Sequence, residues 1–456
     1  MQTQESKLPQ TTRIFYGAGD LGFSMTNSIL TILYAIFLTD VVGLAPKMAA
    51  IAVFVGRSWD YINDPLMGYI SDRTRSRWGR RRPFLLFGFI PFALAFMALW
   101  WIPPTNNEWT LVAYYALAYL VYDAAATFVY MPYYALTPEL TEDYDERTVL
   151  TSYRMVFSII GGLVAWTVPM MIIMHMQPEN ADKVLTMGMI FGAVGAIPLL
   201  LTFLGTREQP QFQTQEQVPF KSSIKAAIRN KPFLFAAGIF LFTWSGMAVI
   251  EGMMLYFLKY HMNMEAQSSM VAGAVFISAL ITLPVWERLS RKYDKRAAYV
   301  AGMLFLSAVV IVLIALPSDL NRTIVYALAA LAGIGVGAVH VLPWSMIPDA
   351  VEWDEVHTGE RHEGMFYSLV LLLRKVSSSI TMPAVLLILE WRGFVSGAVN
   401  QSTSAVNAIR VLMGPFPSVL FVMGILFALF YPLGREKHAE LRQELSLRRS
   451  ASLGSD

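Results

Sequence analysis

Twelve apolar segments, each about as long as a bilayer is thick, divide this chain along its length. A helix needs ~20 residues to cross the hydrocarbon core, where every backbone polar group must be hydrogen-bonded within the protein. Only 15% of the residues are charged, whereas soluble domains carry about 25%. The sequence therefore predicts an all-α polytopic membrane protein with twelve transmembrane helices in two six-helix halves.

A polar, glutamine-rich stretch separates the sixth apolar segment from the seventh. It divides the chain into an N-terminal six-helix bundle at 1–204, a cytoplasmic linker at 205–232, a C-terminal six-helix bundle at 233–434 and a cytoplasmic tail at 435–456. Two repeated halves with a binding site between them near mid-membrane are common in secondary transporters.

Basic residues gather in alternate loops. The loop 71–83 carries six arginines, and the loop 288–296 carries five basic residues. These loops follow the second and the eighth segment, which are equivalent positions in the two halves. Cytoplasmic loops carry the excess of Lys and Arg. We therefore expect a multi-pass protein of the cell (inner or plasma) membrane with both termini in the cytoplasm.

Residue content and spacing disfavour several classes of function. The absence of cysteine excludes disulfides, thiolate catalysis and cysteine-ligated zinc. Gly17–Gly22 matches G-x-G-x-x-G, but it lies inside a spanning segment, where small residues indicate close helix packing rather than dinucleotide binding. No nucleophile–base pair or metal motif emerges. We expect a non-enzymatic monomer without a cofactor, whose partners are a small-molecule solute and the lipid bilayer, not nucleic acid.

The second apolar segment contains two carboxylates four residues apart. On a helix, Asp60 and Asp64 share one face, and Arg57 and Asn63 lie on or beside it. A charge at bilayer depth costs at least about 2.5 kcal/mol, and a small hard cation held by oxygen atoms would neutralise the pair. The pattern predicts a cation site; the alternative is a buried ion network of both aspartates with Arg57.

The fourth segment places Asp123 and Thr127 four residues apart, again on one helical face. The Thr127 hydroxyl either completes the oxygen site of the second segment or bonds its own helix backbone. A proton would not need the neutral oxygens of Thr127 and Asn63, so their presence favours Na⁺ over H⁺ as the coupling ion. The aromatic residues that follow either stack on a sugar ring, line an apolar pocket or only pack helices.

Each of the further charges inside apolar segments has more than one interpretation. Asp20 and Glu251 either line a central cavity or lie at the interface, and Arg154 either pairs with a cavity aspartate or snorkels. The basic residues of segment eleven, Arg374 and Lys375, either hold the solute, balance the aspartates or snorkel. The candidates for gating and charge networks are Arg57, Asp72, Arg73, Glu251, Asp349, Glu352 and Arg361.

The motif W-D-x-I-N-D-P-x-x-G, followed by R-W-G-R-R-R-P, resembles the glycoside–pentoside–hexuronide:cation symporters of the major facilitator superfamily. The resemblance implies a major facilitator fold, and the family's lysine of segment eleven matches Lys375. In the melibiose carrier of that family two aspartates hold the galactoside; the matching positions here are Ser24 and Tyr130, which argues against melibiose-type recognition. The cation-site residues that the resemblance implies are Asp60, Asn63, Asp64 and Thr127.

Shorter stretches are similar to the sodium-dependent lysophosphatidylcholine symporters of animals. They are V-I-E-G at 249–252, L-P-W-S-M-I-P-D at 342–349 and Y-R-M at 153–155, together with the acid Asp123 before Thr127. In that relative the lysine of segment eleven lies near the lipid head group. The resulting candidates for solute binding are Ser24, Asp123, Tyr130, Arg154, Trp344 and Lys375.

Together these features predict a secondary active, cation-coupled symporter that works by alternating access. Na⁺ or H⁺ would favour one conformation by removing repulsion between Asp60 and Asp64, and the solute must favour the same conformation. Family resemblance indicates a sugar or glycoside as solute, and local similarity indicates a lysophospholipid as the alternative. A remoter alternative is a membrane sensor or scaffold without transport.

Overall fold

The structure is a computed structural model, which describes residues 8–141, 144–208, 227–315, 317, 321–358, 363–437, 439–441 and 443–444. Most of the predicted linker lies outside these ranges. Among the predicted site residues, the side chains of Asp60 and Asp72 lie outside the described part, and so does all of Arg361.

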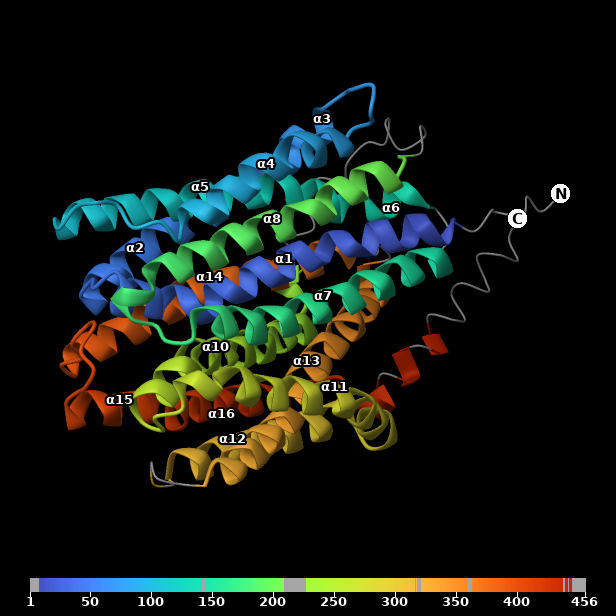
Figure 1. Cartoon of the computed structure of the whole chain (residues 1–456). Coiled ribbons are helices and arrows are strands. Elements are labelled where there is room, and N and C mark those ends of the chain that lie inside the picture. Colours follow the sequence, from blue (N-terminus) through green and yellow to red (C-terminus); the bar gives the residue numbers. More distant parts are fainter. Residues whose placement is uncertain are drawn as a thin grey trace, which may run out of the picture. The chain divides into compact units, whose positions relative to one another are not determined.

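The first half of the sequence forms helices that follow the apolar segments (Figure 1). They are α1 (Gln10–Ile36) with a π-helical end η1 (Phe37–Val41), α2 (Pro46–Ser58), α3 (Asp60–Arg73), α4 (Arg82–Ala98), α5 (Glu108–Ala135), α6 (Thr137–Leu140), α7 (Tyr144–Ile173), η2 (Pro178–Asn180) and α8 (Ala181–Gly205).

The second half of the sequence is helical in the same way, and the described residues contain no strand. Its helices are α10 (Lys231–Tyr260), the short 3₁₀ helix η4 (Glu265–Gln267), α11 (Ser268–Lys292), α12 (Lys295–Ala315), α13 (Arg322–Thr358), α14 (Glu363–Trp391), α15 (Thr403–Met413) and α16 (Pro415–Leu429).

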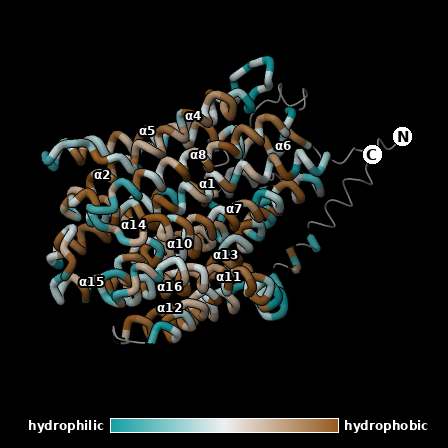
Figure 2. Tube along the Cα trace, in the orientation of Figure 1, coloured by the Kyte–Doolittle hydropathy of each residue, from teal (hydrophilic) through white to brown (hydrophobic). Residues whose placement is uncertain are grey.

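Within the described ranges, ten helical stretches are long and apolar enough to cross a membrane. The third predicted segment is the shorter apolar helix α4, and a turn at Trp59 divides the second into α2 and α3. These two segments and the ten helical stretches account for the twelve that were expected. Figure 2 shows hydrophobic residues along the helices and a hydrophilic connection after α3. The predicted fold class is confirmed.

The chain forms two compact units. The first contains Met1–Glu216 together with Met264–Ser269 and Met382–Ala405, and the second contains Gln217–Asn263, Met270–Thr381 and Val406–Asp456. In the first unit α1 packs against α7 and α8, α4 packs against α5 and α8, and α5 also packs against α2 and α3. In the second unit α10 and α12 each pack against α13 and α16. Two short segments from the second half of the sequence therefore belong to the first unit.

Glycines bring α1 close to its neighbours. A Cβ atom on Gly22 would lie 2.0 Å from the carbonyl oxygen of Gly195 in α8, and one on Gly19 would lie 2.4 Å from the Tyr133 ring. Because no real side chain tolerates such distances, these positions require glycine. The packing role predicted for the glycine motif of this segment is confirmed.

Candidate functional site

Three of the four predicted cation-site residues lie where α3 packs against α5. The Thr127 hydroxyl donates to Asp64 Oδ1 at 3.1 Å, and the Asn63 amide donates to the Asp123 carbonyl oxygen at 3.4 Å. Asn63 and Thr127 are each 5% exposed. The Thr127 hydroxyl thus reaches the carboxylate of the second predicted segment, and it brings oxygen atoms of the kind that hard cations prefer to one place.

Asp60 is the first residue of α3, one helical turn before Asp64. Among the described side chains, no cluster of three His, Asp or Glu is arranged to hold a metal ion. A cation at Asp64 would therefore depend on amide and hydroxyl oxygens, and on the carboxylate of Asp60, which lies outside the described side chains. The role of these four residues stays a prediction.

Arg57 ties α2 to α5 beside this cluster. Its Nε donates to the Tyr119 hydroxyl at 2.7 Å, and its guanidinium lies 5.6 Å from the centre of that ring. Whether Arg57 also joins an ion network with the aspartates, the alternative to a cation site, stays a prediction.

A second polar cluster joins α1, α5 and α7. Asp20 is 4% exposed and accepts a hydrogen bond from the Tyr134 hydroxyl at 3.0 Å. The Arg154 guanidinium lies 5.1 Å from the centre of the Tyr134 ring and interacts electrostatically with Asp20. Its Nε atom is buried and has no hydrogen-bond partner among the described residues. The structure thus brings together Asp20 and Arg154, whose positions the sequence left open.

Ser24 and Tyr130 lie close to this cluster in sequence and make different contacts. The Ser24 hydroxyl donates to the Ser158 carbonyl oxygen at 2.7 Å and so joins α1 to α7. Tyr130 is 2% exposed, and its ring lies 4.6 Å from that of Phe23 and 5.5 Å from that of Phe92. Its buried hydroxyl has no hydrogen-bond partner in the described part of the chain.

The second unit holds a cluster of charged and aromatic side chains on α10, α13 and α14. The Arg374 guanidinium lies 4.1 Å from the centre of the Trp244 ring and interacts electrostatically with Glu251. His340 packs against the same ring at 5.4 Å. The buried Trp244 Nε1 has no hydrogen-bond partner within the described residues.

Sequence reasoning missed Trp244 and His340, and it listed Lys375 rather than Arg374 among the candidates for solute binding. One signal was available for Trp244, which lies two helical turns before Glu251 and therefore on the same face of α10. The two predicted solute-binding residues of this unit lie near the cluster: Lys375 is half-buried on α14, and Trp344 packs against Phe240 at 4.8 Å.

Ion pairs with a buried carboxylate occupy equivalent places in the two halves. In the first, Glu139 in α6 accepts hydrogen bonds from Arg80 at 2.5 Å and Arg81 at 3.0 Å, just before α4. In the second, Lys295 at the start of α12 binds both oxygens of Asp349 in α13 at 2.7 and 2.8 Å. Each pair joins the start of the third spanning helix of its half, α4 or α12, to the region where the fourth spanning helix, α5 or α13, ends. A role of Asp349 in gating stays a prediction.

Two more predicted gating residues are described. Arg73 is exposed at the end of α3, and Glu352 is half-buried in α13. Their role in gating stays a prediction.

Sequence reasoning missed Glu208, whose carboxylate accepts hydrogen bonds from the backbone N–H groups of Arg80, Arg81 and Arg82 at 2.5, 2.7 and 2.9 Å. Such N–H groups at a helix start lack helical partners and favour a negative charge.

Gly79 has φ +108°, and a Cβ atom there would lie 2.5 Å from the Glu208 carboxyl carbon. Glycine is therefore required where the arginine-rich loop approaches Glu208.

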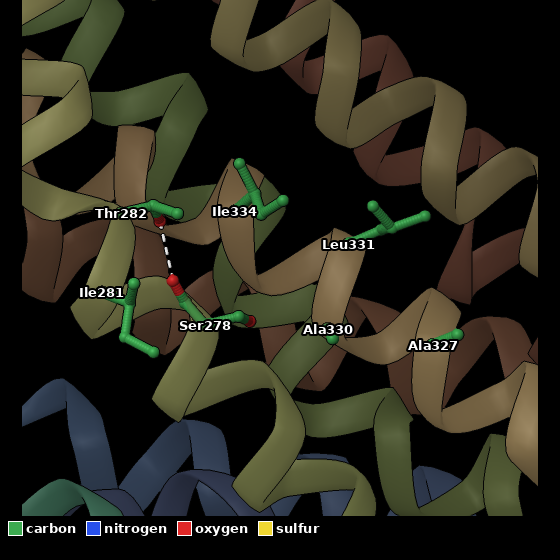
Figure 3. A pocket seen from close by; sticks show the side chains of 7 residues that line it. All are labelled: Ser278, Ile281, Thr282, Ala327, Ala330, Leu331 and Ile334. Carbon is green, nitrogen blue, oxygen red and sulfur yellow. Dashed lines mark hydrogen bonds between the residues drawn. The ribbon is translucent and has the colours of Figure 1, made fainter.

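An apolar cavity of 460 Å³ opens between α11 and α13 in the second unit (Figure 3). The hydroxyl of Ser278 donates to Ala274 O at 2.7 Å and that of Thr282 to Ser278 O at 2.8 Å, so both satisfy their own helix. None of the predicted site residues lines it. Its lining residues are Ser278, Ile281, Thr282, Ala327, Ala330, Leu331 and Ile334.

Comparison with known proteins agrees with this architecture. The family model described as MFS/sugar transport protein matches residues 15–435. An uncharacterized symporter of Synechocystis sp. is 33% identical over 97% of both chains. The sodium-dependent lysophosphatidylcholine symporter 1-A of Danio rerio is 27% identical over 98% of this chain and 90% of its own. The sphingosine-1-phosphate transporter MFSD2B of Xenopus tropicalis is 24% identical over 98% of this chain and 92% of its own.

Solved structures show the same fold at lower sequence identity. The xylose transporter XylE from E. coli superimposes with a TM-score of 0.66 over 94% of this chain and 98% of its own, at 14% identity. The nucleoside transporter NupG superimposes with a TM-score of 0.66 over 92% of this chain and 99% of its own, at 11% identity. These similarities concern the fold alone. The sequence resemblance to symporters of this superfamily is confirmed.

Proposed function

This chain belongs to the MFS/sugar transport protein family and is a symporter of the major facilitator kind, and on that premise we propose that it couples the entry of Na⁺ to the uptake of a lysophospholipid. The observation that supports Na⁺ as the coupling ion is the hydrogen bond from Thr127 to Asp64, beside Asn63. The observation that supports the solute is the Arg374 guanidinium over the Trp244 ring, together with its electrostatic interaction with Glu251.

The cation site fits Na⁺ for a chemical reason. Asp64 carries the charge, and Thr127 and Asn63 add neutral oxygens from α5 and α3. A proton needs one acceptor atom, whereas Na⁺ needs several oxygens around it. An ion bound between α3 and α5 lowers the cost of buried carboxylate charge. Coupling then requires only that ion and solute favour the same conformation.

The second unit supports a zwitterionic head group rather than a sugar. A phosphodiester carries a negative charge that the Arg374 guanidinium can bind, and the carboxylate of Glu251 is suited to a positive group. The aromatic face of Trp244 also attracts cations. A neutral sugar could form hydrogen bonds with both side chains, but it carries no charge for either of them to neutralise. Several relatives are named as sodium-dependent lysophosphatidylcholine symporters, which supports the same solute class.

A sugar or glycoside is the alternative solute. The family description and the first resemblance favour it, and the tyrosines around Tyr130 offer rings on which a sugar can stack. The uptake experiment separates the two solutes because both can be offered to the same vesicles.

The test is uptake into vesicles that contain the purified protein, with an inward Na⁺ gradient. We expect labelled lysophosphatidylcholine to accumulate with the Na⁺ gradient, and a pH gradient alone to have no effect. Asp64→Asn should abolish the Na⁺ dependence. The matched control Asp182→Asn removes an exposed carboxylate at the start of α8 and should change nothing.

Three outcomes would contradict the proposal. Na⁺-driven accumulation that persists in Asp64→Asn removes the proposed ion site. Uptake driven by a pH gradient replaces Na⁺ with H⁺. Na⁺-driven uptake of a glycoside, without uptake of lysophosphatidylcholine, replaces the solute.

A further inference from the structure

The indole N–H of Trp244 is a buried hydrogen-bond donor whose acceptor is missing from the described part of the chain. Trp244 is 8% exposed in α10, and its Nε1 atom is buried without a hydrogen-bond partner there. Buried polar groups are nearly always hydrogen-bonded, because an unpaired one loses its bonds to water without compensation. α10 is long and apolar enough to span the membrane, where lipid supplies no acceptor. The unused donor therefore suits an acceptor atom that a bound solute brings.

A second tryptophan of the same unit shows the ordinary arrangement. Trp286 in α11 is 6% exposed, and its Nε1 donates to the Ile334 carbonyl oxygen of α13 at 2.7 Å. The two tryptophans are thus about equally buried, and they differ in whether the N–H is used. Burial alone does not account for the unused N–H of Trp244.

The charge beside Trp244 indicates which kind of acceptor fits. The Arg374 guanidinium lies 4.1 Å from the centre of the Trp244 ring. An acceptor that reaches the indole N–H is therefore close to a positive charge, which favours an anionic oxygen over a neutral one. Arginine binds phosphate oxygens with particularly strong hydrogen bonds.

His340 adds an acceptor of its own beside the same ring. Its ring centre lies 5.4 Å from that of Trp244, and the residue is exposed although it is in the middle of α13. Nδ1 of His340 lies 3.0 Å from the Val336 carbonyl oxygen. A carbonyl oxygen only accepts, so Nδ1 carries the proton of this bond, and Nε2 of the neutral imidazole is an acceptor. This nitrogen suits a hydroxyl group of the solute.

We propose that Trp244 and His340 are specificity residues for a lysophospholipid head group. The Trp244 N–H donates to a phosphate oxygen, and His340 Nε2 accepts from the free glycerol hydroxyl. This inference rests on the proposed function and deepens it, because it names the atoms that recognise the solute. The diacyl phospholipids of the bilayer carry the same phosphate but have both neighbouring glycerol oxygens esterified. His340 therefore selects the lysophospholipid from the surrounding lipid.

The first test is equilibrium binding of labelled lysophosphatidylcholine to the purified protein in nanodiscs, with the signal of empty nanodiscs subtracted. Trp244→Phe keeps an aromatic ring beside Arg374 and loses the N–H. We expect its Kd to rise about tenfold, the effect of losing a hydrogen bond to a charged group. The matched control Trp286→Phe makes the same chemical change outside the cluster and should stay within about twofold of the parent protein.

The second test compares two ligands, lysophosphatidylcholine and an analogue in which a hydrogen replaces the glycerol hydroxyl. We expect the parent protein to bind the analogue about fivefold more weakly, as for the loss of one neutral hydrogen bond. His340→Phe keeps a flat ring, loses the acceptor nitrogen and should bind both ligands equally. This comparison also tests the proposal if Trp244→Phe does not fold. A His340→Phe protein that still prefers lysophosphatidylcholine by fivefold overturns the role of His340.

The third test needs no solute, because it asks whether the Trp244 N–H has an acceptor within the protein. Trp244→Phe and Trp286→Phe remove the same volume, but only Trp286 loses a hydrogen bond. The melting temperature of the solute-free Trp244→Phe protein should therefore be about 2 °C above that of Trp286→Phe. A Trp244→Phe protein that melts at the same or a lower temperature overturns the proposal.

Binding and uptake separate this inference from the proposed function. Unchanged affinity in Trp244→Phe overturns the inference and leaves Na⁺-coupled uptake standing. A protein that shows the expected losses of binding but does not accumulate lysophosphatidylcholine in vesicles supports the inference and contradicts the proposed transport. A parent protein that does not bind lysophosphatidylcholine overturns the inference together with the proposed solute.

Discussion

At the scale of residues, the pair of Thr127 and Asp64 is central to the proposed ion site. The hydroxyl of Thr127 bonds across to α3, although a threonine inside a helix commonly bonds its own backbone. It therefore adds an oxygen at the carboxylate and also orients that carboxylate. Both effects depend on the hydroxyl and not on the methyl group of the side chain.

We predict that Thr127→Val raises the Na⁺ concentration needed for half-maximal uptake about ten- to hundredfold, because a hydrogen bond to a charged group contributes roughly 1.5–3 kcal/mol. Valine has the same shape as threonine and lacks only the hydroxyl. Thr127→Ser keeps the hydroxyl and should remain within about twofold of the parent protein. Na⁺ titration of uptake measures both variants. Equal Na⁺ dependence in valine and serine variants would exclude Thr127 from the ion site.

At the scale of helices, the contact between α1 and α8 depends on glycine. The two helices approach so closely at Gly22 that the carbonyl oxygen of Gly195 occupies the place of a Cβ atom. Association of helices in a membrane relies on such close packing, because lipid is as apolar as a leucine side chain.

We predict that Gly22→Ala destabilises the protein by about 1–3 kcal/mol, the usual cost of forcing extra volume into a packed interior. The matched control is Gly273→Ala in α11, where a Cβ atom would meet nothing within 4 Å. It should be neutral or slightly stabilising, because alanine favours helix by up to about 1 kcal/mol. Thermal unfolding in detergent compares the two. A Gly22→Ala protein as stable as the Gly273→Ala protein would contradict the close packing.

At the scale of the whole molecule, the basic loops determine how the chain is expected to lie in the membrane. The pairs that the buried carboxylates of Glu139 and Asp349 form, with Arg80 and Arg81 and with Lys295, lie beside these loops in both halves. Their equivalent positions agree with a fold built from two repeats of six helices.

We predict that Arg75→Cys is labelled by a membrane-impermeant maleimide only after the cells are permeabilised, whereas Asn106→Cys is labelled in intact cells. Both residues are exposed, and the third spanning helix separates them. The positive-inside rule places the arginine-rich loop in the cytoplasm. The chain has no cysteine of its own, so each signal comes from the introduced thiol. Labelling in the reverse order would show that the termini face outward.

The sequence alone determined the helical architecture, because each segment must satisfy its own backbone in lipid and is therefore apolar over a bilayer's length. It also indicated which helical faces carry Asp64 and Thr127, since residues four apart share a face.

Only the tertiary structure decided which faces meet. The bond of Thr127 to Asp64 joins two helices, as does the contact of Arg374 with Trp244. Periodicity is local, so it contains no information about partners more than a hundred residues away, such as Arg374 and Trp244. The carboxylate of Glu265, which lies 3.1 Å from Nδ1 of His175 and accepts a hydrogen bond from the backbone N–H of Met176, is a further example. This contact depends on the path of two connections, where no periodic pattern exists.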